Sequence, residues 1–168
     1  MSDILEKINA LKGEYYSTNK KNILFKNEQK FDCANTIVQN MNRTELFNSI
    51  IQINENQFIC NYSLFKTIIN PTIYMDFIDF VFQINDQILQ IHPTYNVCID
   101  LKGLTMTGVE RYKDFISLLS REGQRNGKNF LQRLNCIYIA NPPFMIANIS
   151  KILLPLVDKV IKDKIVIL

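Results

Sequence analysis

The tetrapeptide Asn141-Pro142-Pro143-Phe144 holds the residue types in this chain that could act most directly on a ligand. An asparagine amide and a proline carbonyl can hold the exocyclic amine of an extruded adenine, and an aromatic ring can stack on that base. The same residues can also end a strand and start a helix, because asparagine is a good N-cap and proline suits the first helical turn. The motif alone therefore allows either DNA modification or no chemistry.

An adenine-N6 methyltransferase would need a second site that holds its methyl donor. Such enzymes bind S-adenosylmethionine on a glycine-rich turn after the first strand of a Rossmann-like sheet. The comparable turn, residues 100–108, has Gly103 and Gly108 but no tight Gly-x-Gly, and only one expected strand follows the tetrapeptide. The structural interpretation of the tetrapeptide is therefore favoured, and methyltransferase activity is the least favoured of the functions considered.

Other catalytic and metal-binding patterns are weak. The single histidine, His92, precedes Pro93 in an expected loop, and no serine, cysteine or lysine nucleophile lies beside a plausible base. The four cysteines form no Cys-x-x-Cys pair, which argues against a zinc site. We expect a protein without enzymatic activity, cofactor or metal.

Length and charge limit the remaining function classes. The chain has 168 residues, 47% of them hydrophobic and 21% charged, as is typical of one folded domain. Residues 1–90 carry a net charge of −2 and residues 91–168 carry +5. This mild excess suits contacts with anionic groups but is too small to predict nucleic-acid binding.

Without a signal peptide or a membrane-length apolar run, the sequence predicts a soluble cytoplasmic protein with at most peripheral membrane contact.

The first third of the chain shows the weaker secondary-structure pattern. Apolar residues at helical spacing, with Gly13 as a stop, predict a helix over residues 2–13. Residues 22–25 could form an edge strand, and residues 44–53 could form a helix. We expect a strand over residues 57–65.

From residue 71 onward the pattern is clearer. It predicts helices over residues 71–91 and 108–120, strands over 95–101, 133–140 and 164–168, and a long helix over 142–162 that Pro155 must kink or split. Strands that alternate with helices predict an α/β fold in which right-handed crossovers join a mostly parallel sheet. One domain is expected.

Three segments carry a longer pattern, residues 95–108, 131–145 and 151–168. In this order and spacing they resemble the CRAL-TRIO lipid-binding domain over about 75 residues, and residues 57–94 fit more loosely. Asp100 to Gly103 looks like the family's strand-ending Asp-x-x-Gly, and Leu134 to Phe144 is similar to its strand followed by Asn, Pro, Pro and an aromatic residue. Leu154-Pro155-Leu156 with Lys164-Ile165 looks like its Lys-Pro-Phe-Leu and Lys-Ile ending.

Two related families were weighed against this one. The BCH-type branch, which binds small GTPases and their regulators, resembles residues 128–165 about equally well. A STAS-like domain shares the "IDL" strand and the helix after it, but it does not account for the long kinked helix. CRAL-TRIO, with the BCH-like branch as a possibility, is the resemblance that fits better.

This resemblance implies one α/β domain over residues 1–168, with residues 1–56 divergent and residues 57–168 forming the core. The family's sheet forms the floor of an apolar cavity for a lipid or other hydrophobic molecule, under a mobile gate helix. The sequence ends at Leu168, about where we expect the gate helix, so the resemblance is to a C-terminally shortened domain. The alternative is a closed derivative that serves as a protein-interaction or structural subunit, with a protein partner or a second copy.

Two groups of residues are candidates for contact with a ligand. Apolar side chains at helical spacing could line the cavity, although such residues more often form core: Phe115, Leu119, Phe144, Met145 and Ile149. Basic side chains around one glycine-containing loop could contact an anionic group, although a solvated loop is the simpler interpretation: Arg121, Arg125, Lys128 and Arg133.

Overall fold

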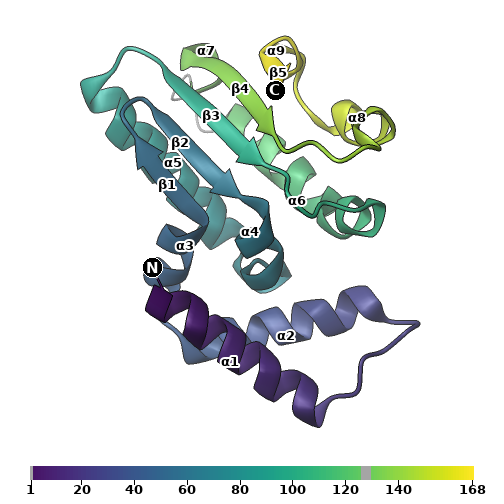
Figure 1. Ribbon diagram of the computed structural model, residues 1–168. Coiled ribbons are helices and arrows are strands. Elements are labelled where there is room, and N and C mark those ends of the chain that lie inside the picture. The colour runs from purple at the N-terminus through teal and green to yellow at the C-terminus, as the bar shows by residue number, and fades with distance from the viewer. Residues whose placement is uncertain (1, 126–129) are drawn as a thin grey trace.

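A five-stranded sheet organises the chain in the computed structural model, which describes residues 2–125 and 130–168. The strands lie side by side in sequence order, and β2 to β5 run parallel (Figure 1). β1 pairs antiparallel with β2. The strands are β1 (Ile51–Asn54), β2 (Gln57–Asn61), β3 (Tyr95–Asp100), β4 (Leu134–Ala140) and β5 (Ile165–Ile167).

Helical crossovers join the parallel strands, as the sequence predicts. Between β2 and β3 lie α4 (Tyr62–Ile68), η1 (Pro71–Ile73) and α5 (Tyr74–Ile91). Between β3 and β4 lie α6 (Met106–Arg125) and α7 (Phe130–Arg133). Between β4 and β5 lie α8 (Ile146–Leu153), η2 (Leu154–Leu156) and α9 (Lys159–Lys162). In Figure 1, α5 and α6 lie together behind the sheet. The α/β prediction is confirmed.

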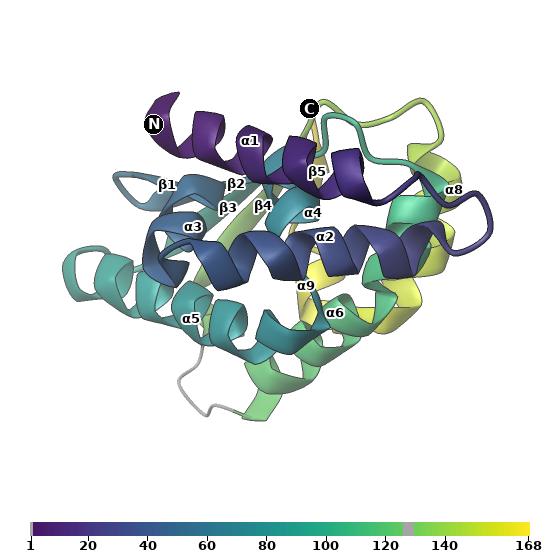
Figure 2. The same ribbon diagram turned by 90° about the horizontal axis from the view of Figure 1, so that it is seen from below.

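The N-terminal part forms three helices and differs most from the prediction. It contains α1 (Ser2–Thr18), α2 (Lys26–Asn40) and α3 (Arg43–Ile50), and Figure 2 shows α1 and α2 side by side. Helix α1 continues through Gly13 because Tyr15 and Tyr16 still pack against the core. The expected strand at residues 22–25 is wrong, since the side chain of Asn22 accepts hydrogen bonds from the backbone N–H groups of Leu24 and Phe25 and closes a turn.

Two asparagines cap helices in the part of the chain where the sequence prediction is least accurate. Asn42 accepts a hydrogen bond from the Glu45 N–H at 3.1 Å and caps α3, which ends where the chain becomes extended at Ile51. Asn61 caps α4 in the same way, through the Leu64 N–H. The predicted strand over residues 57–65 is therefore half strand and half helix.

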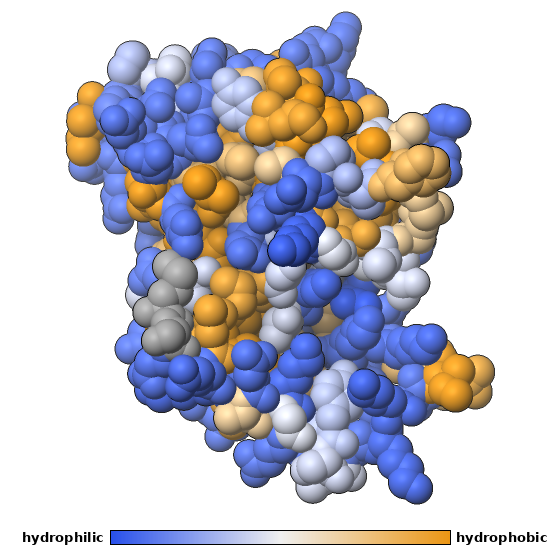
Figure 3. Space-filling view, viewed as in Figure 1, coloured by the Kyte–Doolittle hydropathy of each residue, from blue (hydrophilic) through white to orange (hydrophobic). Residues whose placement is uncertain are grey.

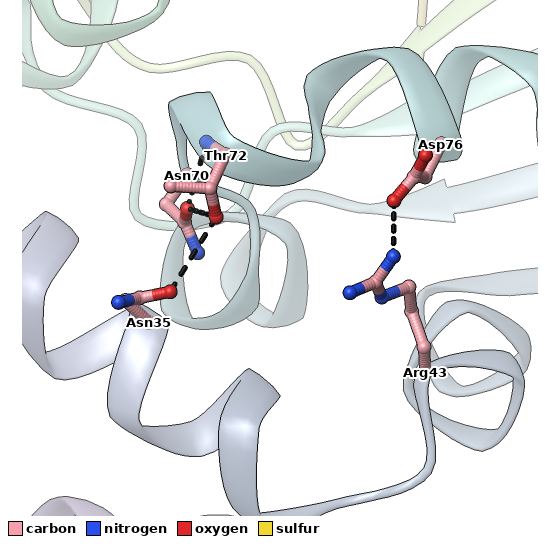
Figure 4. A network of polar contacts seen from close by, with 5 residues as sticks. All are labelled: Asn35, Arg43, Asn70, Thr72 and Asp76. Carbon is pink, nitrogen blue, oxygen red and sulfur yellow. Dashed lines mark hydrogen bonds and ion pairs between the residues drawn. The ribbon is translucent and has the colours of Figure 1, made fainter.

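Polar contacts hold the N-terminal helices to the α/β core (Figure 4). The Thr72 hydroxyl in η1 lies 2.6 Å from Oδ1 of Asn70 and 3.4 Å from Oδ1 of Asn35 in α2. Arg43 at the start of α3 pairs with Asp76 in α5. Together with the apolar cluster that joins Ile8 and Ile37 to α4 and α5, these contacts pack the three helices against the α/β core.

The tetrapeptide that opened the sequence analysis adopts an irregular conformation. Asn141 has a left-handed φ of 48°, and α8 begins only at Ile146, after Met145, which makes no side-chain cap. The N-cap prediction for Asn141 is wrong because its side chain is used elsewhere: Nδ2 donates to Oδ1 of Asp100 at 2.9 Å. Pro155 splits the following helix as expected, in the first turn of η2.

No helix in residues 2–125 or 130–168 combines the length and the apolar character that crossing a membrane requires.

Candidate functional site: an apolar cavity under the sheet

An apolar cavity of about 570 Å³ is lined by one face of the sheet and by the helices that cover this face. Alternate residues of the strands point into it, because successive side chains of a strand face opposite sides of a sheet. The strand residues that line it are Ile51, Phe58, Cys60, Tyr95, Val97, Ile99, Leu134, Ile137, Ile139, Ile165 and Ile167. This volume is within the roughly 300–1,000 Å³ of ordinary small-molecule sites.

Helices α5, α6 and α8 form the remaining walls. The first two lie over the middle of the sheet, and α8, with the broken segment that follows it, closes the side next to β5. The main helical residues that line the cavity are Phe77, Val81, Phe82, Asn85, Val109, Tyr112, Phe115, Ile116, Leu119, Ile146, Ile149, Ser150 and Leu153. An apolar lining of this kind suits an uncharged, largely apolar ligand.

The structure brings three of the five expected ligand contacts together. Phe115 and Leu119 from α6 and Ile149 from α8 all line the cavity. Phe144 and Met145 do not line it, and both side chains are exposed. The reason is local: the chain turns at Asn141 and becomes helical only at Ile146, so the helical spacing that would have carried these two residues inward is absent.

The two described members of the expected basic group, Arg121 and Arg133, have separate partners. The guanidinium of Arg121 is paired with the neighbouring Glu122 carboxylate at 3.4 Å. Arg133 donates to the carbonyl oxygen of Pro93 at 2.9 Å, which fixes the start of β4 to the loop before β3. The side chain of Arg125 and the whole of Lys128 lie outside the described residues.

The carboxyl edge of β3 and β4 joins two of the motifs that carried the family resemblance. One carboxylate oxygen of Asp100 accepts from the Lys102 N–H at 3.0 Å and from Asn141 at 2.9 Å. Gly103 then takes a left-handed φ of 78°, and its carbonyl accepts from the Lys66 ammonium. Glycine suits this turn because a side chain is strained at positive φ. These polar residues hold two loops together at the end of the cavity.

Asn85 is the residue of the site that sequence reasoning missed. It belongs to α5, lines the cavity and is only 3% exposed. Its Oδ1 atom is buried and has no hydrogen-bond partner within the described residues. Leaving a buried acceptor unpaired costs about 1–3 kcal/mol. The indication was a polar residue on the apolar face of α5, one turn from Val81 and Ile88.

Burial favours the neutral form of the cysteine thiol and the tyrosine hydroxyls in the lining. Burial raises the pKa of the Cys60 thiol to about 12, so it is not a reactive thiolate near neutral pH. Burial also raises the pKa of Tyr112, whose hydroxyl donates to the carbonyls of Lys66 and Ile69, each 3.1 Å away. In residues 2–125 and 130–168 no three His, Cys, Asp or Glu side chains gather in a way that could hold a metal.

Comparison with known proteins agrees with this architecture. The sequence profile of the CRAL/TRIO domain matches residues 59–168, which is the part that forms β2 to β5 and the cavity. The crystal structure of Sfh5 superimposes with a TM-score of 0.54 at 14% sequence identity, over 99% of this chain. The chain spans 65% of the length of that structure. No curated protein sequence matches it. Since the profile covers more than half of the sequence, the protein belongs to the CRAL/TRIO domain family.

Proposed function

We propose that this protein binds a lipid or another lipophilic small molecule in the cavity between its sheet and helices, without catalysing a reaction. The cavity of about 570 Å³ with its apolar walls is the observation that supports this most strongly. Membership of a lipid-binding family supports it independently. Phe115, Leu119 and Ile149 are the contacts that we propose for the apolar part of the ligand.

Apolar burial supplies a large part of the free energy that such binding needs. Each methylene group moved from water into the cavity contributes about 0.8 kcal/mol, so a dozen of them contribute about 10 kcal/mol. Association costs an estimated 4–15 kcal/mol in lost freedom of the partners. The apolar contribution is therefore of the same size as this cost, and each further buried methylene group adds to it.

The alternative was a closed domain that serves as an interaction or structural subunit. That function predicts a filled core, whereas the space between α5, α6, α8 and the sheet is hollow. The cavity therefore favours the ligand-binding function.

Lipid extraction tests the proposal. The protein is purified without detergent, extracted with organic solvent, and the extract is analysed by mass spectrometry against a protein of similar size prepared in parallel. We expect about one lipid-class molecule per chain. An extract without lipid, from a protein that forms a single defined oligomer, would favour the structural-subunit alternative.

A further inference from the structure

Asn85 lines the cavity from α5. It lies in the second half of α5, close to the amino ends of β3 and β4, because α5 leads directly into the loop before Tyr95. One turn before it, the ring of Phe82 stacks on Phe130, with ring centroids 5.2 Å apart. The carboxamide is thus a polar group enclosed by aromatic and aliphatic side chains.

The Oδ1 atom of Asn85 is a buried acceptor without a hydrogen-bond donor in the described residues. Buried side-chain acceptors in folded proteins nearly always have one. Within the described residues Oδ1 of Asn85 has none, although the residue is 97% buried and faces a space large enough to hold a ligand. A leucine at this position would fill the same part of the wall without a polar atom. Packing alone therefore does not require an amide here.

We propose that Asn85 accepts a hydrogen bond from the hydroxyl group of a neutral lipid, such as a long-chain alcohol, a sterol or an acylglycerol. This rests on the proposed function and names its ligand class. A hydroxyl can donate to Oδ1 and also accept from the amide nitrogen of the same residue. An ionised headgroup fits poorly here, because an amide carries no charge to offset its desolvation. Lys162 of α9 also lines the cavity.

Two ligands that differ in one hydrogen-bond donor test this assignment. 1-Hexadecanol and hexadecyl methyl ether compete with the dye Nile red for the cavity of the full chain. Wild type should bind the alcohol about five- to tenfold more tightly, as one hydrogen bond predicts. Asn85→Leu should bind the two ligands equally, with affinity for the ether no weaker than that of wild type.

The controls separate this inference from the proposed function. Gln87→Leu makes the same kind of change on the exposed face of α5 and should keep the preference for the alcohol. A second variant, Asn85→Ala, tests the same contact if the leucine variant does not fold. If wild type shows no preference, or if both Asn85 variants retain it, Asn85 does not contact the ligand, although ligand binding stands. Failure of every protein to bind the dye or either ligand overturns the proposed function as well.

A separate observation concerns the loop between α1 and α2. Ile23, Leu24 and Phe25 are 80%, 85% and 60% exposed and form an apolar tip that projects at the lower right of Figure 3. The loop is ordered, because Asn22 holds the N–H groups of Leu24 and Phe25 and the Gln29 amide donates to the Lys20 carbonyl. The backbone therefore holds three large apolar side chains in solvent.

Lysines surround this apolar tip. Lys20, Lys21 and Lys26 flank it in sequence and are exposed. The adjoining hollow between α1 and α2 is lined by Lys12 and Lys30 as well. Apolar side chains that enter the acyl region beneath a ring of cations are the arrangement that binds an anionic membrane surface.

We infer that residues 20–26 dock the protein on anionic membranes. Sedimentation with vesicles of phosphatidylcholine, with and without 30% phosphatidylserine, tests this. Wild type should sediment only with the anionic vesicles and should be released by high salt. The double variant Leu24→Asp, Phe25→Asp should lose at least tenfold in binding, whereas Ile91→Asp, which changes an equally exposed residue at the end of α5, should not.

Three outcomes would overturn the membrane assignment. Wild type could leave both kinds of vesicle in the supernatant, or the double variant could sediment as wild type does. The third is a wild-type dimer in solution that the double variant converts to a monomer, because this would assign the apolar tip to a second copy of the chain.

Discussion

At the scale of single residues, Tyr112 shows how the cavity wall is fixed. Its ring lies on α6 with its centroid 4.8 Å from that of Phe65, and its hydroxyl reaches the carbonyls of Lys66 and Ile69 at the end of α4. Lys66 lies in the last turn of α4 and Ile69 is its C-cap, so one side chain from α6 holds the end of another helix. The wall of the cavity depends on this contact.

Tyr112→Phe should therefore destabilise the protein. Removing the hydroxyl leaves a buried carbonyl without its donor, and we expect a loss of about 1–2 kcal/mol in the free energy of unfolding. Urea denaturation measures the change. Tyr15→Phe, in the half-buried ring of α1, should change it by less than about 0.5 kcal/mol. If Tyr112→Phe and wild type had the same free energy of unfolding, the hydrogen bonds of this hydroxyl would not stabilise the protein.

Buried tyrosine and cysteine groups predict a loss of stability at alkaline pH. Burial raises the pKa of Tyr74 to about 12, whereas a tyrosine in the unfolded chain ionises near pH 10. Cys60 is raised to about 12 from an ordinary value near 9. The unfolded chain loses these protons first, so stability is complete below about pH 9 and falls progressively up to about pH 12.

Urea midpoints between pH 8 and pH 11 measure this dependence. Tyr74→Phe should reduce the fall without abolishing it, because burial also raises the pKa of Tyr62 and Tyr95. A midpoint that does not change up to pH 11 would contradict the burial of these groups.

The site residues that could be predicted from the sequence are those whose direction is determined by helical spacing alone. Phe115, Leu119 and Ile149 could be predicted, because each lies inside a regular helix with an apolar face. Phe144 could not, because its direction depends on the left-handed conformation of Asn141 and on a hydrogen bond to Asp100, 41 residues away in sequence. Asn85 was missed because a single polar residue does not break an apolar face.

At the scale of secondary-structure elements, one lysine joins three of them. The Lys164 ammonium, just before β5, donates to the Leu131 carbonyl of α7 at 2.8 Å and to the Leu134 carbonyl at the start of β4. It closes the amino edge of the sheet where the broken helical segment ends. The Lys-Ile ending of the family resemblance has a structural role in this chain.

Lys164→Met should weaken this edge of the fold. The variant keeps most of the aliphatic stem and loses two charge-assisted hydrogen bonds, so we expect about 1.5–3 kcal/mol less stability. Thermal and urea unfolding measure the loss, with a variant of the exposed Lys159 in α9, Lys159→Met, as the matched control. If the two variants unfold alike, the contacts of Lys164 do not stabilise the sheet.

The elements that could be predicted are those whose apolar pattern is set by the sheet. From Tyr95 onward each strand is an apolar run that pairs with the preceding strand, so the order of elements could be read directly. The sequence did not predict helix α2, because few of its residues are buried: Cys33, Ala34, Ile37 and Val38. Its position depends on contacts with α1 and α4, which local sequence does not specify.

At the scale of the whole molecule, the cavity results from the way in which the layer of helices packs against the sheet. Aromatic side chains of α4, α5 and α6 pack on one another, with Phe65 in contact with Phe77 and Phe115. These contacts stabilise the helices as a layer of their own. The alternating aliphatic residues of β3 and β4 therefore face a hollow of about 570 Å³. Its size could not be predicted from the sequence, because cavity-lining and core residues have the same composition.

Filling this hollow should separate binding from folding. Leu119→Trp places a larger apolar side chain where Leu119 lines the cavity, so we expect it to exclude ligand while the protein stays folded. Ser117→Trp adds the same side chain to the exposed face of α6. Circular dichroism and thermal unfolding should show both variants folded.

Native mass spectrometry after incubation with liposomes of a natural lipid extract tests the central claim most directly. Wild type and Ser117→Trp should each carry one lipid-sized mass per chain, and Leu119→Trp should carry none. An unliganded wild type, or a Leu119→Trp variant that carries as much lipid as wild type, would contradict binding in this cavity.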